Sequence, residues 1–134
     1  MNQYLLQYAQ RIDPHVTEED VLEIKELNDW DLLITFTNGR KVVFDRFNGY
    51  HQDVFYDNVH NITPEQEAQE FAYRLRSLMG RRRISQEELA EAIGTTQALI
   101  SRYVRGENIP SVIAARKIAK VLNCSIDDLF YKEY

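Results

Sequence analysis

The first half of the chain alternates hydrophobic and polar residues with the period of two that is typical of β-strands. This pattern predicts three strands, at residues 21–28, 31–37 and 41–47. A short helix is predicted at residues 2–12, and it ends before Pro14 because the residue preceding a proline avoids the helical conformation. The pattern therefore predicts a small antiparallel β-meander with one short helix.

The turn at residues 37–39 sets the register between the second and third strands. A three-residue loop with its glycine in the left-handed conformation pairs Ile34 with Val42. The same register pairs Leu32 with Phe44. A two-residue Asn-Gly loop would put these hydrophobic sets on opposite faces of the sheet, so we expect the longer loop.

Residues 48–62 have no clear hydrophobic period and predict irregular structure followed by a linker. Their aromatic residues Tyr50, Phe55 and Tyr56 either pack onto the meander or form part of a subunit interface, where aromatic side chains are enriched. The sequence leaves both alternatives open.

After residue 62 the hydrophobic spacing becomes helical and predicts five helices within residues 64–131. Capping residues mark their starts, at Thr63, Ser85, Thr95 with Thr96, Ser111 and Ser125, and glycines follow the second and third helices at Gly94 and Gly106. The fold class is therefore α+β, with an acidic αβ domain at residues 1–62 and a helical domain at residues 63–134.

The net charge of −5 argues against DNA binding when it is taken for the whole chain. Residues 1–62 contain five basic and eleven acidic residues, a net charge of −6, whereas residues 63–134 have a net charge of +1. Within residues 72–120 there are ten basic and four acidic residues, a net charge of +6. The positive charge is thus concentrated in the helical half, as the recognition of phosphates requires.

Residues 85–106, SQEELAEAIGTTQALISRYVRG, predict two short helices joined by a tight turn. Ala90 is small enough for the helices to cross closely, and Gly94 adopts a positive φ without strain. Ile93 and Ile100 point inward and fix the angle between the helices. The outward face of the second helix is then free to enter a DNA major groove, which is wide enough for a helix.

This motif resembles that of the Cro/cI-like (XRE-type) helix-turn-helix repressors of phages and bacteria. The resemblance covers about residues 71–131, and outside the motif it rests on Leu75, Leu78, Pro110, Ser111, Ile118, Ala119, Leu129 and Phe130. It implies a five-helix lambda-repressor-like domain in a transcriptional regulator that binds double-stranded DNA. It further implies a repressor that acts as a homodimer. Val104 departs from the resemblance, because many members have a glutamate there.

The resemblance implies that the helix starting at Thr96 reads the bases. Gln97 is similar to the first base reader of the family, and a glutamine bonds N6 and N7 of adenine. Ala98 faces a thymine methyl group. Ser101 and Arg102 lie one turn further along, and Arg102 is suited to O6 and N7 of guanine.

Other polar residues are implied as contacts to the DNA backbone. They are Gln86, Thr96, Arg105, Arg81, Arg82 and Arg83. The amide of Gln86 is also placed to brace the first base reader. Several of these assignments have a simpler alternative. The arginines at 81–83 could be only a solvated helix end, and Arg102 could be a surface residue without a base partner. Gln86 could be only a residue that favours the start of a helix.

No pattern in the sequence predicts an enzyme, a metal site or a cofactor. The residues His51, His60, Asp53 and Asp57 form an imaginable metal cluster, but nothing in the sequence fixes their geometry. Cys124 is the single cysteine, so no disulfide is expected within the chain, and we expect its thiol to be buried. No membrane-spanning run and no signal peptide is apparent, which predicts a cytoplasmic protein.

Two roles remain open for residues 1–62. The meander has exposed strand edges and is a candidate for the dimerisation element. Alternatively, the acidic domain binds a basic protein partner, as in an antitoxin-like regulator.

Overall fold

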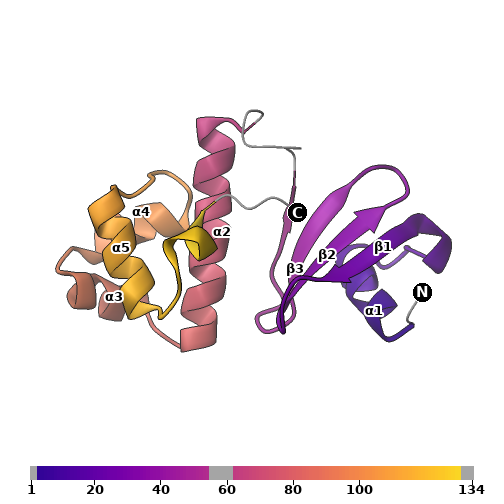
Figure 1. Ribbon diagram of the computed structural model, residues 1–134, viewed down its shortest axis with the longest axis horizontal. Helices are drawn as coiled ribbons and strands as arrows, with labels where there is room; N and C mark the ends of the chain where they lie inside the picture. The colour runs from indigo at the N-terminus through magenta and orange to yellow at the C-terminus, as the bar shows by residue number, and fades with distance from the viewer. Residues whose placement is uncertain (1–2, 55–61, 131–134) are drawn as a thin grey trace. The chain divides into compact units, whose positions relative to one another are not determined.

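The computed structural model describes residues 3–54 and 62–130, which form two compact units (Figure 1). One unit contains an N-terminal helix and a sheet, and the other contains the helices that follow Thr63. Phe55 and Tyr56 lie outside the described residues, as do Asp57 and His60. Within the described residues, no helix is both long and apolar enough to cross a membrane.

Within residues 3–54, the N-terminal unit is built from one α-helix, one short 3-10 helix and four strands. They are α1 (Gln3–Ile12), η1 (Glu18–Asp20), β1 (Val21–Glu26), β2 (Asp31–Phe36), β3 (Lys41–Asp45) and β4 (His51–Asp53). The strands form one antiparallel sheet in the order β1-β2-β3-β4. With the helices of the second unit, this confirms the α+β fold class.

The hairpin between β2 and β3 has the predicted register. Ile34 lies opposite Val42, and Leu32 lies opposite Phe44. Gly39 has a φ of 92°, the left-handed conformation that the three-residue loop requires. The predicted register and loop are therefore confirmed, and they place these hydrophobic side chains in one core with α1.

β1 departs from simple alternation. A β-bulge between Val21 and Glu23 shifts the register against β2, so Val21 and Ile24 both pack into the core of this unit. Leu22 is left 68% exposed. The bulge adds one residue to one strand only, and the hydrophobic pattern of β1 by itself does not reveal it.

The prediction of irregular structure after β3 is wrong for β4. This strand has only three residues, which is too short for a period of two to be recognised, and it pairs with β3. The turn before it depends on the fully buried Asp45. The carboxylate of Asp45 accepts hydrogen bonds from the backbone N–H groups of Phe47 and Asn48 and from the side-chain amide of Asn48.

Within residues 62–130, the second unit contains four α-helices and a final 3-10 helix, at the places that the capping residues predict. They are α2 (Pro64–Arg82), α3 (Gln86–Ile93), α4 (Gln97–Val104), α5 (Val112–Val121) and η3 (Ile126–Leu129). The side chains that accept a hydrogen bond from the first turn are those of Thr63, Ser85, Thr96, Ser111 and Ser125. These caps satisfy backbone donors that would otherwise have no partner.

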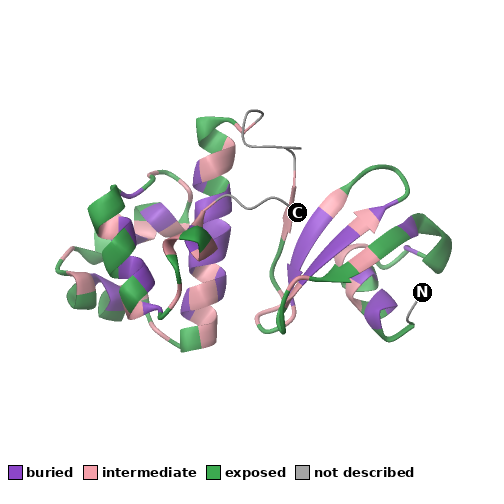
Figure 2. Ribbon diagram, viewed as in Figure 1, coloured by how far each residue is buried: buried purple, intermediate pink, exposed green. Residues whose placement is uncertain are grey.

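The helices of this unit share one hydrophobic core. Figure 2 shows buried residues on each of α2 to α5 beside exposed positions of the same helices. The core consists of Phe71, Leu75, Met79, Leu89, Ala90, Ile100, Tyr103, Ile118, Ala119, Leu122 and Leu129. Cys124 packs against it and is half-buried, whereas we expected its thiol to be buried.

Candidate nucleic-acid interface

α3 and α4 form a helix-turn-helix. Gly94 ends α3 with a φ of 75°, and the N–H of Thr95 donates to the carbonyl of Ala90 at 2.9 Å. Ala90 is only 3% exposed, as the close crossing of the helices requires. Ile100 and Tyr103 anchor α4 in the core, so one side of this helix faces inward.

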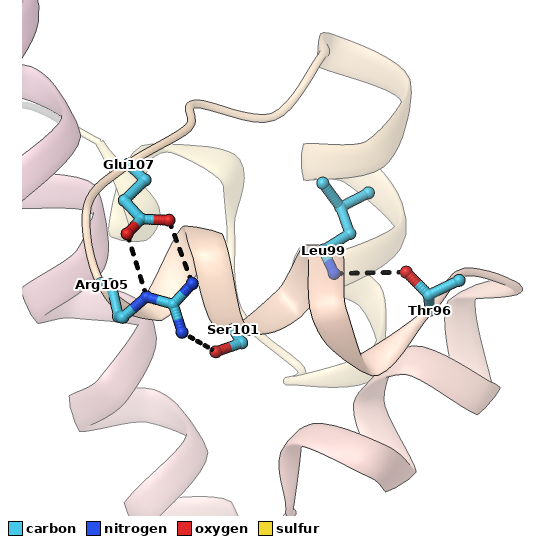
Figure 3. Close-up of polar contacts among 5 residues, drawn as sticks. All are labelled: Thr96, Leu99, Ser101, Arg105 and Glu107. Atoms are coloured by element: carbon cyan, nitrogen blue, oxygen red, sulfur yellow. Dashed lines mark hydrogen bonds and ion pairs between the residues drawn. The ribbon is translucent and has the colours of Figure 1, made fainter.

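The start of α4 is held by Thr96. The hydroxyl of Thr96 accepts a hydrogen bond from the N–H of Leu99 at 3.2 Å (Figure 3). The predicted contact of Thr96 with the DNA backbone therefore has to coexist with its role as the cap of α4. The hydroxyl retains its own proton for a further partner.

The outward face of α4 carries the predicted base readers. Gln97, Ala98 and Arg102 are exposed, and Ser101 is half-exposed. The side chains of Gln97 and Arg102 form no hydrogen bond or ion pair with any other residue that the structure describes. Both are thus available to bind a partner outside the protein.

Arg105 follows α4 and joins two other polar side chains on its surface. Its guanidinium donates to the hydroxyl of Ser101 at 2.6 Å and to both carboxylate oxygens of Glu107 at 3.1 Å (Figure 3). This hydrogen bond lowers the pKa of Glu107, so the carboxylate is ionised at neutral pH. Sequence reasoning missed Glu107, although an acidic residue two positions after a predicted phosphate contact was the available signal.

The three consecutive arginines before the motif are placed differently from one another. Arg82 donates to the carbonyl of Leu122 at 2.9 Å and to that of Asn123 at 3.4 Å, and so ties the end of α2 to the end of α5. Arg81 is half-buried, whereas Arg83 is exposed and ends α2 in the left-handed conformation. The guanidinium of Arg82 is thus engaged within the protein, although Arg82 and Arg83 are both exposed.

Gln86 and Val104 are two further residues of the motif whose surroundings the structure describes. Gln86 is the first residue of α3 and is half-buried, and within the described residues its amide makes no hydrogen bond to Gln97. Val104, where the motif departs from the resemblance, packs against the hydrophobic core. The carbonyl of Val104 accepts a hydrogen bond from Arg76 at 2.8 Å, a link between α2 and α4 that sequence reasoning did not identify.

The described residues contain no group of three or more His, Cys, Asp and Glu side chains that is arranged to hold a metal ion. His51 and Asp53 lie on β4, and Asp53 forms an ion pair with Arg40 at 2.8 Å. The two other members of the imagined cluster are not among the described residues.

Known proteins resemble the helical half of the chain. Residues 75–129 match the Helix-turn-helix family HTH_3. The HTH-type transcriptional regulator YgzD of Bacillus subtilis, itself uncharacterized, is 32% identical over 60 residues, which are 45% of this chain and 91% of YgzD. An uncharacterized HTH-type transcriptional regulator of Archaeoglobus fulgidus is 39% identical over 57 residues, which are 42% of this chain and 81% of that protein.

Among solved structures, the restriction-modification controller protein C.AhdI from Aeromonas hydrophila is 30% identical, with a TM-score of 0.45. The match covers 47% of this chain and 96% of C.AhdI. The two regulators described above match this chain over most of their own length, and the match to the HTH_3 family covers the segment that contains α3 and α4. The chain therefore belongs to the HTH_3 (XRE, Cro/cI-like) family of helix-turn-helix DNA-binding transcriptional regulators, which are not enzymes.

Proposed function

We propose that this regulator is a repressor that binds a pseudo-palindromic operator as a homodimer, with α4 in the major groove. The observation that supports this most directly is the outward face of α4, where Gln97 and Arg102 are exposed and form no hydrogen bond or ion pair within the described residues. Repression follows from the resemblance to phage and bacterial repressors. A dimer bound over a promoter would block access to it.

In this proposal the outward side of α4 reads the bases. Gln97 bonds an adenine and Arg102 a guanine, each through two hydrogen bonds. Ala98 contacts a thymine methyl group, and Ser101 bonds a base edge one turn further along. These four side chains are spaced so that they all face away from the core.

Contacts to the DNA backbone come from residues that flank α4 and the turn. We assign them to Thr96, Gln86, Arg83 and Arg81, which position the protein without reading sequence, and to Arg105 only where a phosphate displaces Glu107 from its guanidinium. Arg82 contributes less, because its guanidinium already binds the carbonyl groups of Leu122 and Asn123. Residues 63–134 are accordingly proposed as the DNA-binding domain.

A homodimer is proposed because one recognition helix covers only a few base pairs. Two copies place their recognition helices about 34 Å apart, one turn of DNA, on a two-fold symmetric site. Ile109, Val112 and Ile113 form an apolar patch around the start of α5, with 40%, 63% and 68% of each residue exposed. This patch belongs to the same unit as α4. A contact between the patches of two copies therefore sets the distance between their two recognition helices directly.

The sheet edge of the N-terminal unit is the alternative dimer surface. β1 is an outer strand of the sheet, and its exposed residues include Glu23, Lys25 and Glu26. Charged side chains on an outer strand discourage pairing with a second strand. We therefore favour the α5 patch over the edge of β1.

Selection of bound sequences from random duplex DNA tests the function. We expect a single enriched site with two inverted half-sites about one DNA turn apart. A reporter gene with this site across its promoter is expected to be silenced when the protein is expressed. Equal recovery of all sequences contradicts specific binding, and increased reporter expression contradicts repression.

Binding of a basic protein by the N-terminal unit is a second candidate function. Exposed carboxylates follow one another along η1 and the start of β1, at Glu18, Glu19, Asp20 and Glu23. A basic protein recovered by the wild type, and lost with the triple variant Glu18→Gln, Glu19→Gln, Glu23→Gln, would support this function. Recovery of the chain alone from its own cells would count against it.

A further inference from the structure

Three polar side chains at the end of α4 form a chain of hydrogen bonds on the surface proposed to face DNA. The carboxylate of Glu107 binds the guanidinium of Arg105 through two bonds of 3.1 Å, and the same guanidinium donates to the hydroxyl of Ser101 at 2.6 Å. Figure 3 shows the guanidinium between the other two groups. Arg105 is therefore already oriented in the free protein.

Glu107 brings a negative charge next to a residue that is proposed to bind phosphate. The side chains of Arg105 and Glu107 remain 56% and 52% exposed, so solvent screens the pair and it contributes little to folding stability. A DNA phosphate and the Glu107 carboxylate are both anions that bind a guanidinium through two oxygens. They compete for the same donors of Arg105.

We propose that Glu107 is a specificity-determining residue, which holds Arg105 on Ser101 and away from the phosphates. This inference rests on the proposed function, because it requires the outward face of α4 to bind DNA. The Glu107 carboxylate therefore lowers the affinity of the protein for DNA of every sequence, because the same phosphates are present in all DNA.

The contact with Ser101 explains why specificity is also affected. A hydroxyl donates one hydrogen bond and accepts up to two. Because the Ser101 oxygen accepts from Arg105, its proton remains to be donated to an acceptor on a base edge, such as N7 or O6 of guanine. Arg105 occupies one of the two lone pairs of Ser101. If Arg105 moves to a phosphate, both lone pairs are free, so Ser101 accepts from a base donor more readily and its preference for a base acceptor is relaxed.

The test is the Glu107→Gln variant of the full chain, measured by fluorescence anisotropy over a series of KCl concentrations. One probe is a duplex of random sequence and the other is the selected operator. We expect about threefold to tenfold tighter binding of the random duplex at ~0.1 M salt, and a slope of log K against log salt that is steeper by ~0.9. The ratio of operator affinity to random-duplex affinity is expected to fall about threefold to tenfold.

Two further variants make the test decisive. Asp127→Asn removes the same charge from η3, which packs mainly against α2 and α5, and it should leave the slope and the affinity ratio unchanged. In an Arg105→Ala background, Glu107→Gln should steepen the slope by clearly less than ~0.9 and leave the affinity ratio unchanged, because the competing guanidinium is absent and only the weaker influence of Glu107 on Arg102 remains.

An unchanged slope and ratio in Glu107→Gln would overturn the inference. So would a change of the same size in the Arg105→Ala background. The random duplex requires no operator, so the slope reports on Glu107 even if selection finds no preferred sequence. That latter result contradicts the proposed function instead.

Discussion

Replacing both Gln97 and Arg102 by alanine is expected to abolish the sequence preference of DNA binding. Both side chains are exposed on the outward face of α4 and form no hydrogen bond or ion pair within the described part of the chain, so their loss should not destabilise the fold. Each bidentate base contact contributes about 1–3 kcal/mol of discrimination, and the pair therefore about 2–6 kcal/mol. The measurement is the dissociation constant for the selected operator and for a random duplex.

The matched control for this double variant is Arg83→Ala. Arg83 is exposed at the end of α2 and is proposed to bind phosphate. Its loss should weaken binding to both duplexes by the same factor, because phosphate contacts carry no sequence information. If the alanine double variant still prefers the operator by the wild-type ratio, α4 is not the reader of the sequence.

The double variant Val112→Thr, Ile113→Gln removes two side chains of the proposed dimer contact. It is expected to bind the two half-sites of the operator without cooperativity. Both replacements are neutral, so they add no charge that would repel DNA. Three apolar side chains supply only part of the ~800 Å² per partner that a stable interface buries, so we expect the dimer to form largely on DNA. Affinity for the full operator should fall about a hundredfold, as expected when a bivalent contact becomes monovalent, while affinity for one half-site should stay unchanged.

Leu22→Gln on β1 is the control that separates the two dimer surfaces. Leu22 is as exposed as Ile113, at 68%, and it lies on the outer strand of the sheet. Gel shifts with a full operator and a half-site distinguish the outcomes. If Leu22→Gln loses cooperativity and the α5 variant keeps it, the sheet edge joins the two copies and the α5 patch does not.

Short-range chemistry made much of this fold predictable. The helix starts at Thr63, Ser85 and Ser125 follow from side-chain caps that bond backbone groups three residues away. The hairpin register follows from Gly39 and from the need to keep Ile34 and its neighbours on one face. In each case the residues that decide the structure lie close together in the chain.

Features that depend on distant partners were not predictable in the same way. β4 exists because its backbone pairs with β3, and three residues carry too little hydrophobic pattern to reveal it. The bulge in β1 is defined only by its pairing with β2. Both features belong to the sheet and not to the local sequence.

The sequence by itself determined the helix-turn-helix, because Ala90, Gly94 and Ile100 act through local geometry and a short-range crossing of two helices. Only the tertiary structure decided which basic side chains are available for DNA. Arg82 is an equal member of an arginine run in the sequence, yet it binds the carbonyl of Leu122, 40 positions further along. The charge of an arginine is a property of its residue type, but its availability depends on which acceptors folding brings within hydrogen-bond distance.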